Sequence, residues 1–575
     1  MQKNGAEIFV ESLIRENVEV VFGYPGGQVL PIFNALYGAP FKFILPRHEQ
    51  GAAHMADGYA RSSGKVGVCL ATSGPGATNL VTGLATAYMD SVPMVAFTGQ
   101  VATTMIGNDA FQEADITGIT RPVTKHNFLV KDVNELARTI REAFLIASTG
   151  RPGPVLIDIP SDVQRAVTEF VWPEKVEIRS YKPNYHGHPG QIKRAAQAIN
   201  ESKQPVLYIG GGVITSDATA EVLELAKKAD IPVTNTLLGI GAFPPDSPLY
   251  LGMLGMHSTY FANMAMQNTD LIIAVGSRFD DRCTGKVSHF APKAKIVHID
   301  IDPTSISKSI SADIPVVGDA KTVVTELIKE VKKATHPAWI ATINKWKKAQ
   351  PLSYKKDSAL RPQYVIDRVS EITKGQAILV TDVGQHQMWS AQYYKARKPR
   401  TFLSSGGLGT MGYGLPGGIG AKMAFPNKEV IVISGDGGFQ MNIQELATAV
   451  VNKINVKAFI LNNGYLGMVR QWQELFWDKR YSHTCLHKSS LCPSKCNKPG
   501  QKACPIYTPD FVKVAEAYGA VGIRVTDKKN VDQVIKKVLA LNKTVVVEFI
   551  VEQEENVFPM VPAGHALDEI MTSLA

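Results

Sequence analysis

Short apolar, β-branched runs alternate with amphipathic stretches along this chain, and the alternation recurs in each third of the sequence. Buried strands are expected at 20–22, 66–71, 92–97, 155–159, 205–209, 271–275, 295–301, 377–381, 430–433, 457–461 and 544–550. Helical periodicity lies between them, as at 6–16 and 135–148. Strands that alternate with helices are typical of βαβ units and parallel sheets. We therefore predict an α/β protein built from doubly wound parallel sheets.

Two polar connections divide this pattern into three domains. They run from about residue 172 to 189 and from about 336 to 362, and both are expected to be poor in helix. A chain of 575 residues also exceeds the size at which one core stops growing. The expected domains are residues 1–172, 189–335 and 362–550, followed by a tail at 551–575.

Composition narrows the class of protein. The chain is 45% hydrophobic and 20% charged, as in ordinary globular proteins. No apolar run is long enough to span a bilayer, and the N-terminus lacks an apolar signal region, so we expect a cytoplasmic protein without a membrane partner. The net charge of +9 comes from scattered Lys and Arg, which favours attraction of small anions over binding of nucleic acid.

The strongest local motif follows the strand at 430–433. It reads Gly435, Asp436, Gly437, Gly438, and the next strand ends in Asn462, Asn463, Gly464. A glycine-rich turn lets backbone N–H groups approach a phosphate, and carboxylate and amide oxygens suit Mg²⁺. A plain tight turn would explain the glycines alone.

The spacing from this Gly-Asp-Gly to the Asn-Asn pair resembles the signature of thiamine-diphosphate enzymes. The resemblance implies that Asp436, Asn463 and the backbone carbonyl of Tyr465 hold Mg²⁺, which binds the diphosphate. It also implies two doubly wound thiamine-diphosphate-binding domains that flank a third domain. The other residues that it assigns to the cofactor are Val383, Gly384, Gln385, His386, Gly409, Met411 and Gly467.

Glu49, in Leu45-Pro-Arg-His-Glu-Gln-Gly, precedes a small-residue helix. A lone Glu there could cap the helix. By the resemblance it is the activating glutamate, which binds the aminopyrimidine ring and so promotes loss of the thiazolium proton. Met411 would be the apolar wedge that keeps the two cofactor rings bent, although a lone Met is more often core.

Further segments resemble one family among these enzymes, the acetohydroxyacid synthases, over nearly the whole chain. The string Arg278-Phe-Asp-Asp-Arg282 and the segment Leu254-Gly-Met-His257 match those that line FAD in a central flavin-binding domain. The full set implied for FAD is Arg151, Gly210, Gly211, Gly212, Leu254, Gly255, Met256, His257, Gly276, Arg278, Asp280, Asp300, Ile301 and Asp319.

The family also implies a substrate pocket. Trp472 would shape the space for the second ketoacid, a discrimination worth roughly 1–3 kcal/mol per methylene. The residues implied around the reacting carbons and their channel are Gly27, Phe111, Gln112, Arg282, Met468 and Trp472. A packed surface aromatic would explain Trp472 equally well on its own.

The reaction that the resemblance implies is decarboxylation of pyruvate, followed by attack of the hydroxyethyl enamine on pyruvate or 2-ketobutyrate. The products are acetolactate or acetohydroxybutyrate, in branched-chain amino-acid biosynthesis. A homodimer or homotetramer with its active site at the dimer interface is implied, and a small regulatory subunit is a further candidate partner. The alternatives are a pyruvate oxidase, a glyoxylate carboligase and a non-catalytic relative; Glu49, Trp472 and the Arg278–Arg282 string argue against them.

The chain departs from the family at several points. Ser161 stands where the family has Lys by the substrate path, and Gln28, Ser258 and Cys283 replace an Ala, a Gly and a Val. An insertion at about 485–505 carries four of the six cysteines, Cys485, Cys492, Cys496 and Cys504. They could hold Zn²⁺ or an iron–sulfur cluster, or remain reduced thiols on a loop.

Overall fold

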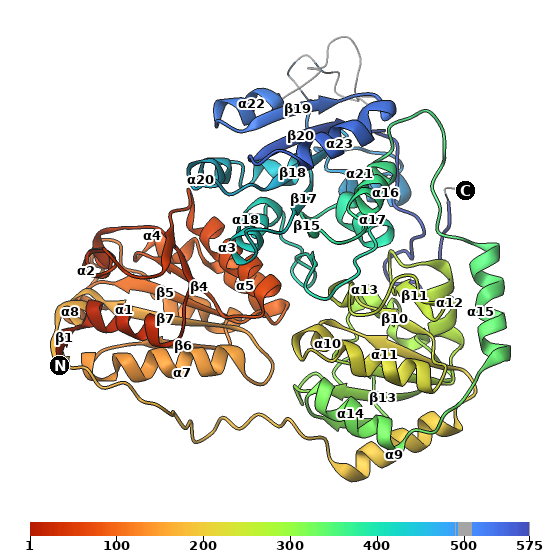
Figure 1. The fold of residues 1–575 in the computed structure, drawn as a ribbon, viewed down its shortest axis with the longest axis horizontal. Coiled ribbons are helices and arrows are strands. Elements are labelled where there is room, and N and C mark those ends of the chain that lie inside the picture. The colour runs from red at the N-terminus through yellow and green to blue at the C-terminus, as the bar shows by residue number, and fades with distance from the viewer. Residues whose placement is uncertain (489, 491, 493–508, 574–575) are drawn as a thin grey trace.

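The computed structural model describes residues 1–488, 490, 492 and 509–573. Three six-stranded sheets form three lobes, and helices cover both faces of each sheet (Figure 1). Every neighbouring pair of strands within these sheets is parallel. The predicted fold of three doubly wound α/β domains is therefore confirmed.

The N-terminal sheet has the order β3-β2-β4-β5-β7-β6. Its strands are β2 (Val20–Gly23), β3 (Lys42–Ile44), β4 (Gly67–Ala71), β5 (Met94–Gln100), β6 (His126–Leu129) and β7 (Pro154–Pro160). Its longer helices are α1 (Gly5–Arg15), α3 (Glu49–Ser63), α5 (Val81–Met89) and α7 (Leu136–Ser148). A separate antiparallel pair, β1 (Gln2–Asn4) with β8 (Val167–Glu169), ties the start of this lobe to its end.

The central sheet has the order β11-β10-β9-β12-β13-β14. Its strands are β9 (Pro205–Ile209), β10 (Val233–Asn235), β11 (Tyr250–Met253), β12 (Leu271–Val275), β13 (Lys295–Asp300) and β14 (Ile314–Val317). Its helices are α9 (Pro189–Glu201), α10 (Gly211–Thr215), α11 (Thr219–Lys228), α12 (Tyr260–Asn268), α13 (Asp281–Thr284) and α14 (Ala320–Glu330).

The C-terminal sheet has the order β16-β15-β17-β18-β20-β19. Its strands are β15 (Ile378–Thr381), β16 (Phe402–Leu403), β17 (Val430–Gly435), β18 (Lys457–Asn462), β19 (Val521–Val525) and β20 (Val545–Ile550). Its helices are α16 (Pro362–Ile372), α17 (Gln385–Tyr393), α18 (Gly414–Ala424), α19 (Asp436–Gln440), α20 (Glu445–Val451), α21 (Gly467–Phe476), α22 (Phe511–Ala517) and α23 (Val531–Leu539).

The second connection between domains differs from the expectation. It contains a helix, α15 (Pro337–Ala349), where a helix-poor segment was predicted. Trp339 of α15 is buried in the central core, and its indole N–H donates to the Pro205 carbonyl over 3.1 Å. Trp339 and Ile343 give α15 a buried apolar face within an otherwise polar stretch.

The two outer domains share one core through α3 and α18. Side chains such as Ala52 and Tyr59 of α3 and Ile419 of α18 belong to one hydrophobic cluster. The helices approach very closely: a Cβ on Gly58 would lie 2.1 Å from the Gly417 carbonyl oxygen, and a Cβ on Gly420 would lie 1.9 Å from that of Met55. Only glycine fits at these positions.

The C-terminal tail leaves the third domain and lies on the central one. The Val561 N–H donates to the Met256 carbonyl over 2.8 Å, and the Lys286 N–H donates to that of His565 over 2.9 Å. Val561 and Leu567 are buried in the central core.

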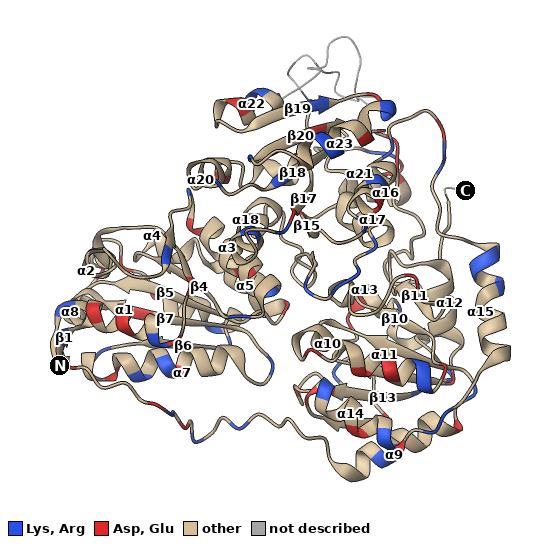
Figure 2. Ribbon diagram, viewed as in Figure 1, with Lys and Arg blue, Asp and Glu red and all other residues tan. Residues whose placement is uncertain are grey.

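Charged residues of both signs are interspersed over the three lobes, without a continuous basic stripe in this view (Figure 2). None of the helices that the structure describes combines the length and the apolar character needed to cross a membrane.

Candidate active site

The sheet topology determines where the predicted site residues gather. In each sheet the first strand lies inside, and the chain leaves it towards both edges, which makes a switch point between two strands: β2 and β4, β9 and β12, β15 and β17. Ligands of open α/β sheets bind outside the carboxyl ends of the strands at such points. The predicted residues Gly27, Gly210, Gly276, Val383 and Gly435 lie at or just after the carboxyl ends of these strands.

The residues predicted to hold Mg²⁺ come together at the ends of β17 and β18. The Gly464 N–H donates to Asp436 Oδ2 over 3.1 Å, and the Tyr465 N–H donates to Asn463 Oδ1 over 3.0 Å. Burial raises the pKa of Asp436 to about 7, although backbone N–H groups of its turn lower it. No Lys or Arg in the described ranges forms an ion pair with Asp436, so a bound cation would supply the missing positive charge.

His386 offers a second sign of an absent ligand. Its ring is buried, its Nε2 has no hydrogen-bond partner within the described part of the chain, and burial lowers its pKa to about 3. A Cβ on Gly435 would lie only 2.9 Å from the Nδ1 atom of His386. A neutral imidazole therefore stands beside the glycine turn, where an anionic diphosphate would meet it, and the residues present fit that group.

No three His, Cys, Asp or Glu side chains of the described residues gather as a metal site. The predicted magnesium set contains one carboxylate only, and the remaining ligands would be an amide oxygen, a carbonyl oxygen and phosphate or water.

The loop that carries Met411 is held by a buried carboxylate. Asp382, directly after β15, accepts N–H groups of Gly412 at 3.1 Å and of Gly414 at 2.9 Å, and also that of Val383 at 2.8 Å. Asp382 thus connects the predicted cofactor-binding segment 383–386 to the loop of Met411, the predicted apolar wedge.

A chain of buried amides links these loops to α21. Asn463 Nδ2 donates to Gln385 Oε1 over 3.3 Å, and Gln385 Nε2 donates to Gln471 Oε1 over 3.0 Å. Gln471 in turn accepts the Val557 N–H at 2.8 Å and donates to its carbonyl at 3.1 Å. We refer to residues 462–465, which include Asn463 and Tyr465, as the metal loop. Helix α21, which carries Met468 and Trp472, is therefore fixed both to the metal loop and to the C-terminal tail.

Glu49 is the first residue of α3. The helix is capped by the His48 side chain, which accepts the Gln50 N–H, so Glu49 does not serve as the cap residue. Asn79 Nδ2 donates to Glu49 Oε2 over 2.9 Å, and Glu49 Oε1 lies 3.3 Å from where a Cβ on Gly76 would be. The carboxylate thus lies beside the turn that follows β4.

Gln112 lies against the same turn. A Cβ on Gly74 would be 2.8 Å from the Gln112 carbonyl oxygen, and Gln112 adopts a left-handed φ of 58°. Such strain in a non-glycine residue often marks a functional site. Its neighbour Phe111 is 85% exposed, so this part of the predicted pocket is open in a single chain.

A second carboxylate, from the third domain, holds the backbone just before Glu49. Glu445 on α20 accepts the Arg47 N–H with both oxygens, at 3.0 and 3.1 Å, and the Thr448 hydroxyl at 2.7 Å. Burial raises the pKa of Glu445 to about 7. Sequence reasoning missed Glu445 and Asp382; an acidic residue directly after a predicted strand could have indicated Asp382, whereas nothing local indicates Glu445.

The residues predicted for FAD line the carboxyl edge of the central sheet. A Cβ on Gly212 would lie 2.6 Å from the Gly276 Cα, so the turns after β9 and β12 are in backbone contact. Asp300 ends β13, and burial raises its pKa to about 6. Asp319 caps α14 and Asp280 caps α13. The Met256 N–H donates to the Arg282 carbonyl over 2.7 Å, which joins the segment at 254–257 to α13.

Open polar groups are consistent with a ligand at this edge. His257 Nδ1 and Gln392 Oε1 are buried without a partner among the described residues. Arg151 pairs with Asp302 at 3.0 Å. The Arg282 side chain is exposed, and its partners within the described part of the chain are the Met256 sulfur and Asp281, each at 3.7 Å. A dinucleotide fits this arrangement, with Arg282 left at the rim.

The base of the cysteine-rich insertion lies on the metal loop. Cys485 forms an antiparallel bridge with Tyr465; the Leu466 N–H donates to the Thr484 carbonyl and the Leu486 N–H to that of Gly464, both over 2.9 Å. A Cβ on Gly464 would lie 2.5 Å from the His487 ring. Cys496 and Cys504 of the predicted second metal set lie outside the described residues.

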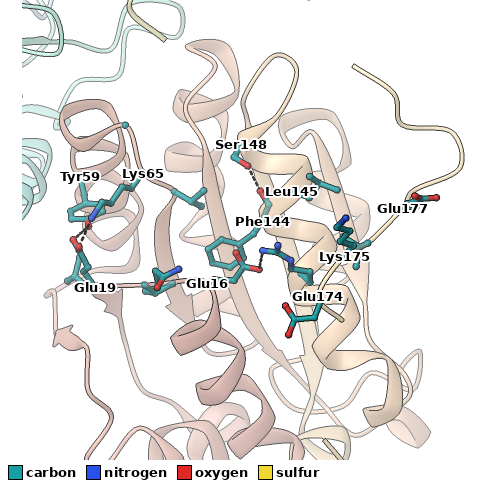
Figure 3. Close-up of a pocket in the computed structure, with 17 residues that line it drawn as sticks. Glu16, Glu19, Tyr59, Lys65, Phe144, Leu145, Ser148, Glu174, Lys175 and Glu177 are labelled. Atoms are coloured by element: carbon teal, nitrogen blue, oxygen red, sulfur yellow. Dashed lines mark hydrogen bonds and ion pairs between the residues drawn. The ribbon is translucent and has the colours of Figure 1, made fainter. Parts of the chain in front are cut away.

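A groove of about 670 Å³ lies elsewhere, between the end of α1, α7 and the connection at 174–177 (Figure 3). It contains none of the predicted site residues. Four of its charged side chains are paired: Glu16 with Arg141 at 2.7 Å, and Glu19 with Lys65; Glu19 also accepts the Tyr59 hydroxyl at 2.6 Å. With these groups satisfied, the groove gives no indication of its own chemistry.

Comparison with known proteins bears on the whole chain. Family models match residues 3–119 as "Thiamine pyrophosphate enzyme, N-terminal TPP binding domain", residues 192–327 as the central domain and residues 382–549 as the C-terminal TPP binding domain. The match is to the same three units that the sheets define.

Similar proteins extend over almost the full length. The acetolactate synthase of Mycobacterium bovis is 50% identical and covers 100% of this chain and 92% of its own. The acetolactate synthase isozyme 3 large subunit of Escherichia coli is 47% identical, with 99% and 98% covered. The acetolactate synthase large subunit of Corynebacterium glutamicum is 49% identical, with 99% and 90% covered.

Proposed function

Because this chain belongs to the acetolactate synthase family of thiamine pyrophosphate enzymes, we propose that it decarboxylates pyruvate and joins the two-carbon remainder to a second 2-ketoacid. The products are 2-acetolactate from pyruvate and 2-aceto-2-hydroxybutyrate from 2-ketobutyrate, which feed branched-chain amino-acid synthesis. The observation that carries the proposal is the buried Asp436, which pairs with no Lys or Arg of the described residues and lies beside Asn463. Both are at the switch point of a domain that matches the TPP-binding family model.

Thiamine diphosphate, when bound, supplies the carbon nucleophile and accepts the electron pair released with carbon dioxide. The protein's part is to hold and orient it. Asp436, Asn463 and the Tyr465 carbonyl would hold Mg²⁺, and His386 and the N–H groups of the glycine turn would meet the diphosphate. Glu49 would hold the proton of the aminopyrimidine ring, with Asn79 fixing its second oxygen.

FAD is proposed to bind the carboxyl edge of the central sheet in a structural role, because the overall reaction involves no net oxidation. The glycine contact between Gly212 and Gly276 and the unpartnered His257 support this position. Arg282 and Trp472 are proposed to border the path and pocket of the second ketoacid.

We further propose that the complete site forms between two chains in the cytoplasm. Exposed apolar side chains lie next to predicted site residues: Phe111 is 85% exposed beside Gln112, and Leu30 is 58% exposed after Gly27. A partner subunit would cover them. The names of relatives as large subunits support a small regulatory partner as well.

The test is acetolactate formation from pyruvate with thiamine diphosphate, Mg²⁺ and FAD omitted in turn, beside Glu49→Gln and the exposed control Glu19→Gln. The proposal expects activity to need all three, and kcat to fall about 10²–10³-fold in Glu49→Gln alone. Activity that ignores FAD would remove the flavin from the proposal. No acetolactate from protein shown to bind thiamine diphosphate would overturn it.

The cysteine-rich insertion is proposed to bind zinc or an iron–sulfur cluster, which its four cysteines support. Elemental analysis of anaerobically purified protein is expected to find one of the two metals, at a stoichiometry that falls when Cys492 is replaced by Ser. Protein with neither zinc nor iron would leave the insertion as a loop with reduced thiols.

A further inference from the structure

A short turn after α5 touches all three domains. In this junction turn (residues 89–91), the Met89 carbonyl accepts Arg278 Nη2 of the central domain at 3.0 Å. Arg151, which pairs with Asp302 of the central domain at 3.0 Å, donates Nε to Ser91 Oγ at 2.8 Å. The side chain of Asp90, between them, faces the third domain.

Asp90 holds the loop that precedes Met411. Its two oxygens accept the N–H groups of consecutive glycines, Gly406 at 3.0 Å and Gly407 at 2.6 Å. A Cβ on Gly407 would lie 2.8 Å from Asp90 Oδ1, so the backbone comes close because no side chain intervenes. We refer to residues 404–413 as the cofactor loop, since it contains Gly409 and Met411.

Arg61, on α3, fixes Asp90. Its Nη2 donates to Asp90 Oδ2 at 2.8 Å, and its Nε and Nη2 donate to Asp57 at 2.5 and 3.2 Å. The Arg61 side chain is 10% exposed, and both carboxylates are fully buried. A planar guanidinium can bridge two carboxylates in this way, and a lysine ammonium lacks that fork.

The same group of residues also reaches both ends of the cofactor loop. Arg61 Nη1 donates to the Ser404 carbonyl at 2.9 Å, and the Tyr413 hydroxyl donates to Asp57 Oδ1 at 2.8 Å. Between these ends, the Thr86 and Thr410 hydroxyls lie 2.7 Å apart. The N-terminal domain therefore fixes the cofactor loop at its start, middle and end.

We propose that Asp90 is a positioning residue for the cofactor loop, that Arg61 holds Asp90 in place, and that the junction turn makes the position of this loop depend on the central domain. The inference rests on the proposed function, which gives Met411 its contact with thiamine diphosphate and Arg151 and Arg278 theirs with FAD. Binding of FAD at the carboxyl edge of the central sheet would order the side chains of Arg151 and Arg278. Because these side chains contact Ser91 and Met89, FAD would also fix the position of Asp90 between them.

Asp90→Asn tests this with little change in volume. An asparagine has one acceptor oxygen in place of two, so one glycine N–H or Arg61 loses its partner. Asp270→Asn is a matched control. Asp270 likewise accepts consecutive backbone N–H groups, Lys203 at 2.8 Å and Gln204 at 3.1 Å, but at the opposite edge of the central sheet.

The first measurement is amide hydrogen exchange of the protein without cofactors, compared before and after FAD is added. We expect exchange in 404–413 to be roughly tenfold faster in Asp90→Asn than in the parent and unchanged in Asp270→Asn. FAD should slow exchange there in the parent and not in Asp90→Asn. Equal exchange in the parent and Asp90→Asn overturns the role of Asp90, and no effect of FAD on the parent overturns the junction.

The second measurement separates positioning from general loss of structure. Arg61→Lys should raise the thiamine diphosphate concentration for half-maximal activity roughly tenfold and leave the KM for pyruvate unchanged. Arg141→Lys, which alters a partly buried ion pair that does not touch the third domain, should change neither. Parallel changes in both variants would mean a structural effect only. The exchange result stands without turnover, so a failed synthase assay would not be mistaken for failure of this inference.

Discussion

Gly464 turns the metal loop back towards the insertion, and two independent constraints hold it as glycine. Its φ is +75°, and a Cβ would lie 2.5 Å from His487. Residues with side chains pay roughly 1–2 kcal/mol for this backbone region, before any clash is counted.

Gly464→Ala is therefore expected to raise the Mg²⁺ concentration needed for half-maximal activity by about tenfold or more. A Mg²⁺ titration at saturating thiamine diphosphate measures this. Gly38→Ala is the matched control, because Gly38 has a φ of +84° and nothing within 4 Å of the added Cβ. If both variants need the same Mg²⁺, contact with His487 does not matter to the loop.

Glu445 makes stability depend on pH. Burial raises its folded pKa from 4.5 to about 7. Between these values the folded protein keeps a proton that the unfolded chain has lost, so the contribution of this group falls as pH rises through that window and is constant above it. The loss is on the order of 3 kcal/mol.

Glu445→Gln has no such proton, and its amide oxygen can still accept the Arg47 N–H. We expect its apparent Tm to fall less between pH 5 and pH 8 than that of the parent. Differential scanning calorimetry at several pH values, with the exposed Glu326→Gln as control, measures this. Identical pH profiles for the parent and Glu445→Gln would show that Glu445 does not hold the proton.

Some residues of the site were accessible to sequence reasoning because their signal is local. Asp436 with its glycines, and Asn463 after an apolar run, can be recognised from their spacing. Glu445 and Asp90 do not, because each acts on backbone N–H groups more than 300 positions away along the chain. Long-range hydrogen bonds to backbone leave no pattern in a single sequence.

Helix α21 shows how an element is oriented by its buried face. Gln471 forms a two-way amide pair with Val557, and Arg470 lies against the rings of Tyr465 at 4.6 Å and Tyr481 at 4.3 Å and pairs with Glu554 at 2.9 Å. Trp472 on the same helix depends on these anchors for its direction.

Gln471→Glu would place an acceptor opposite the Val557 carbonyl, at a cost of about 1–3 kcal/mol. We expect the variant to lose preference for 2-ketobutyrate when both ketoacids compete, because Trp472 loses its fixed orientation. The ratio of acetohydroxybutyrate to acetolactate measures this. Gln473→Glu, half-exposed on the same helix, should keep the parental ratio; an equal fall in both would indicate a charge effect.

All eleven strands that the sequence pattern predicted lie inside the sheets, and the missed ones lie mainly at the edges. β3, β6, β11, β14, β16 and β19 are the outermost strands, and none was expected. Edge strands are short and half-exposed, so they lack the continuous apolar run that marks a strand buried on both faces. β10, next to an edge, has three residues, too few for any periodicity.

At the scale of the whole molecule, the proposed shared site predicts complementation. In a dimer with Glu49 from one chain and Asp436 from the other, a mixed dimer of Glu49→Gln and Asp436→Ala chains keeps one intact site of two. Random assortment makes half of the dimers mixed, so co-expression should restore about a quarter of parental activity.

Two separately tagged chains are co-expressed and assayed for acetolactate. The unselected mixture should keep about a quarter of parental activity, and mixed dimers purified over both tags should keep about half. Each variant expressed alone serves as the control and should stay inactive. If the mixed dimers are as inactive as the two single-variant dimers, Glu49 and Asp436 of one site come from the same chain and the interface proposal is wrong.

The bridge between Cys485 and Tyr465 has a consequence for engineering. Before the insertion, the chain is fastened by Thr484 and Leu486; after it, Asp510 caps α22 and pairs with Arg524 at 2.6 Å. The chain is thus held by contacts within the described residues on both sides of the insertion. A foreign ligand-binding module grafted between residues 488 and 509 would exert its strain next to the metal loop and make this synthase a biosensor whose output is turnover.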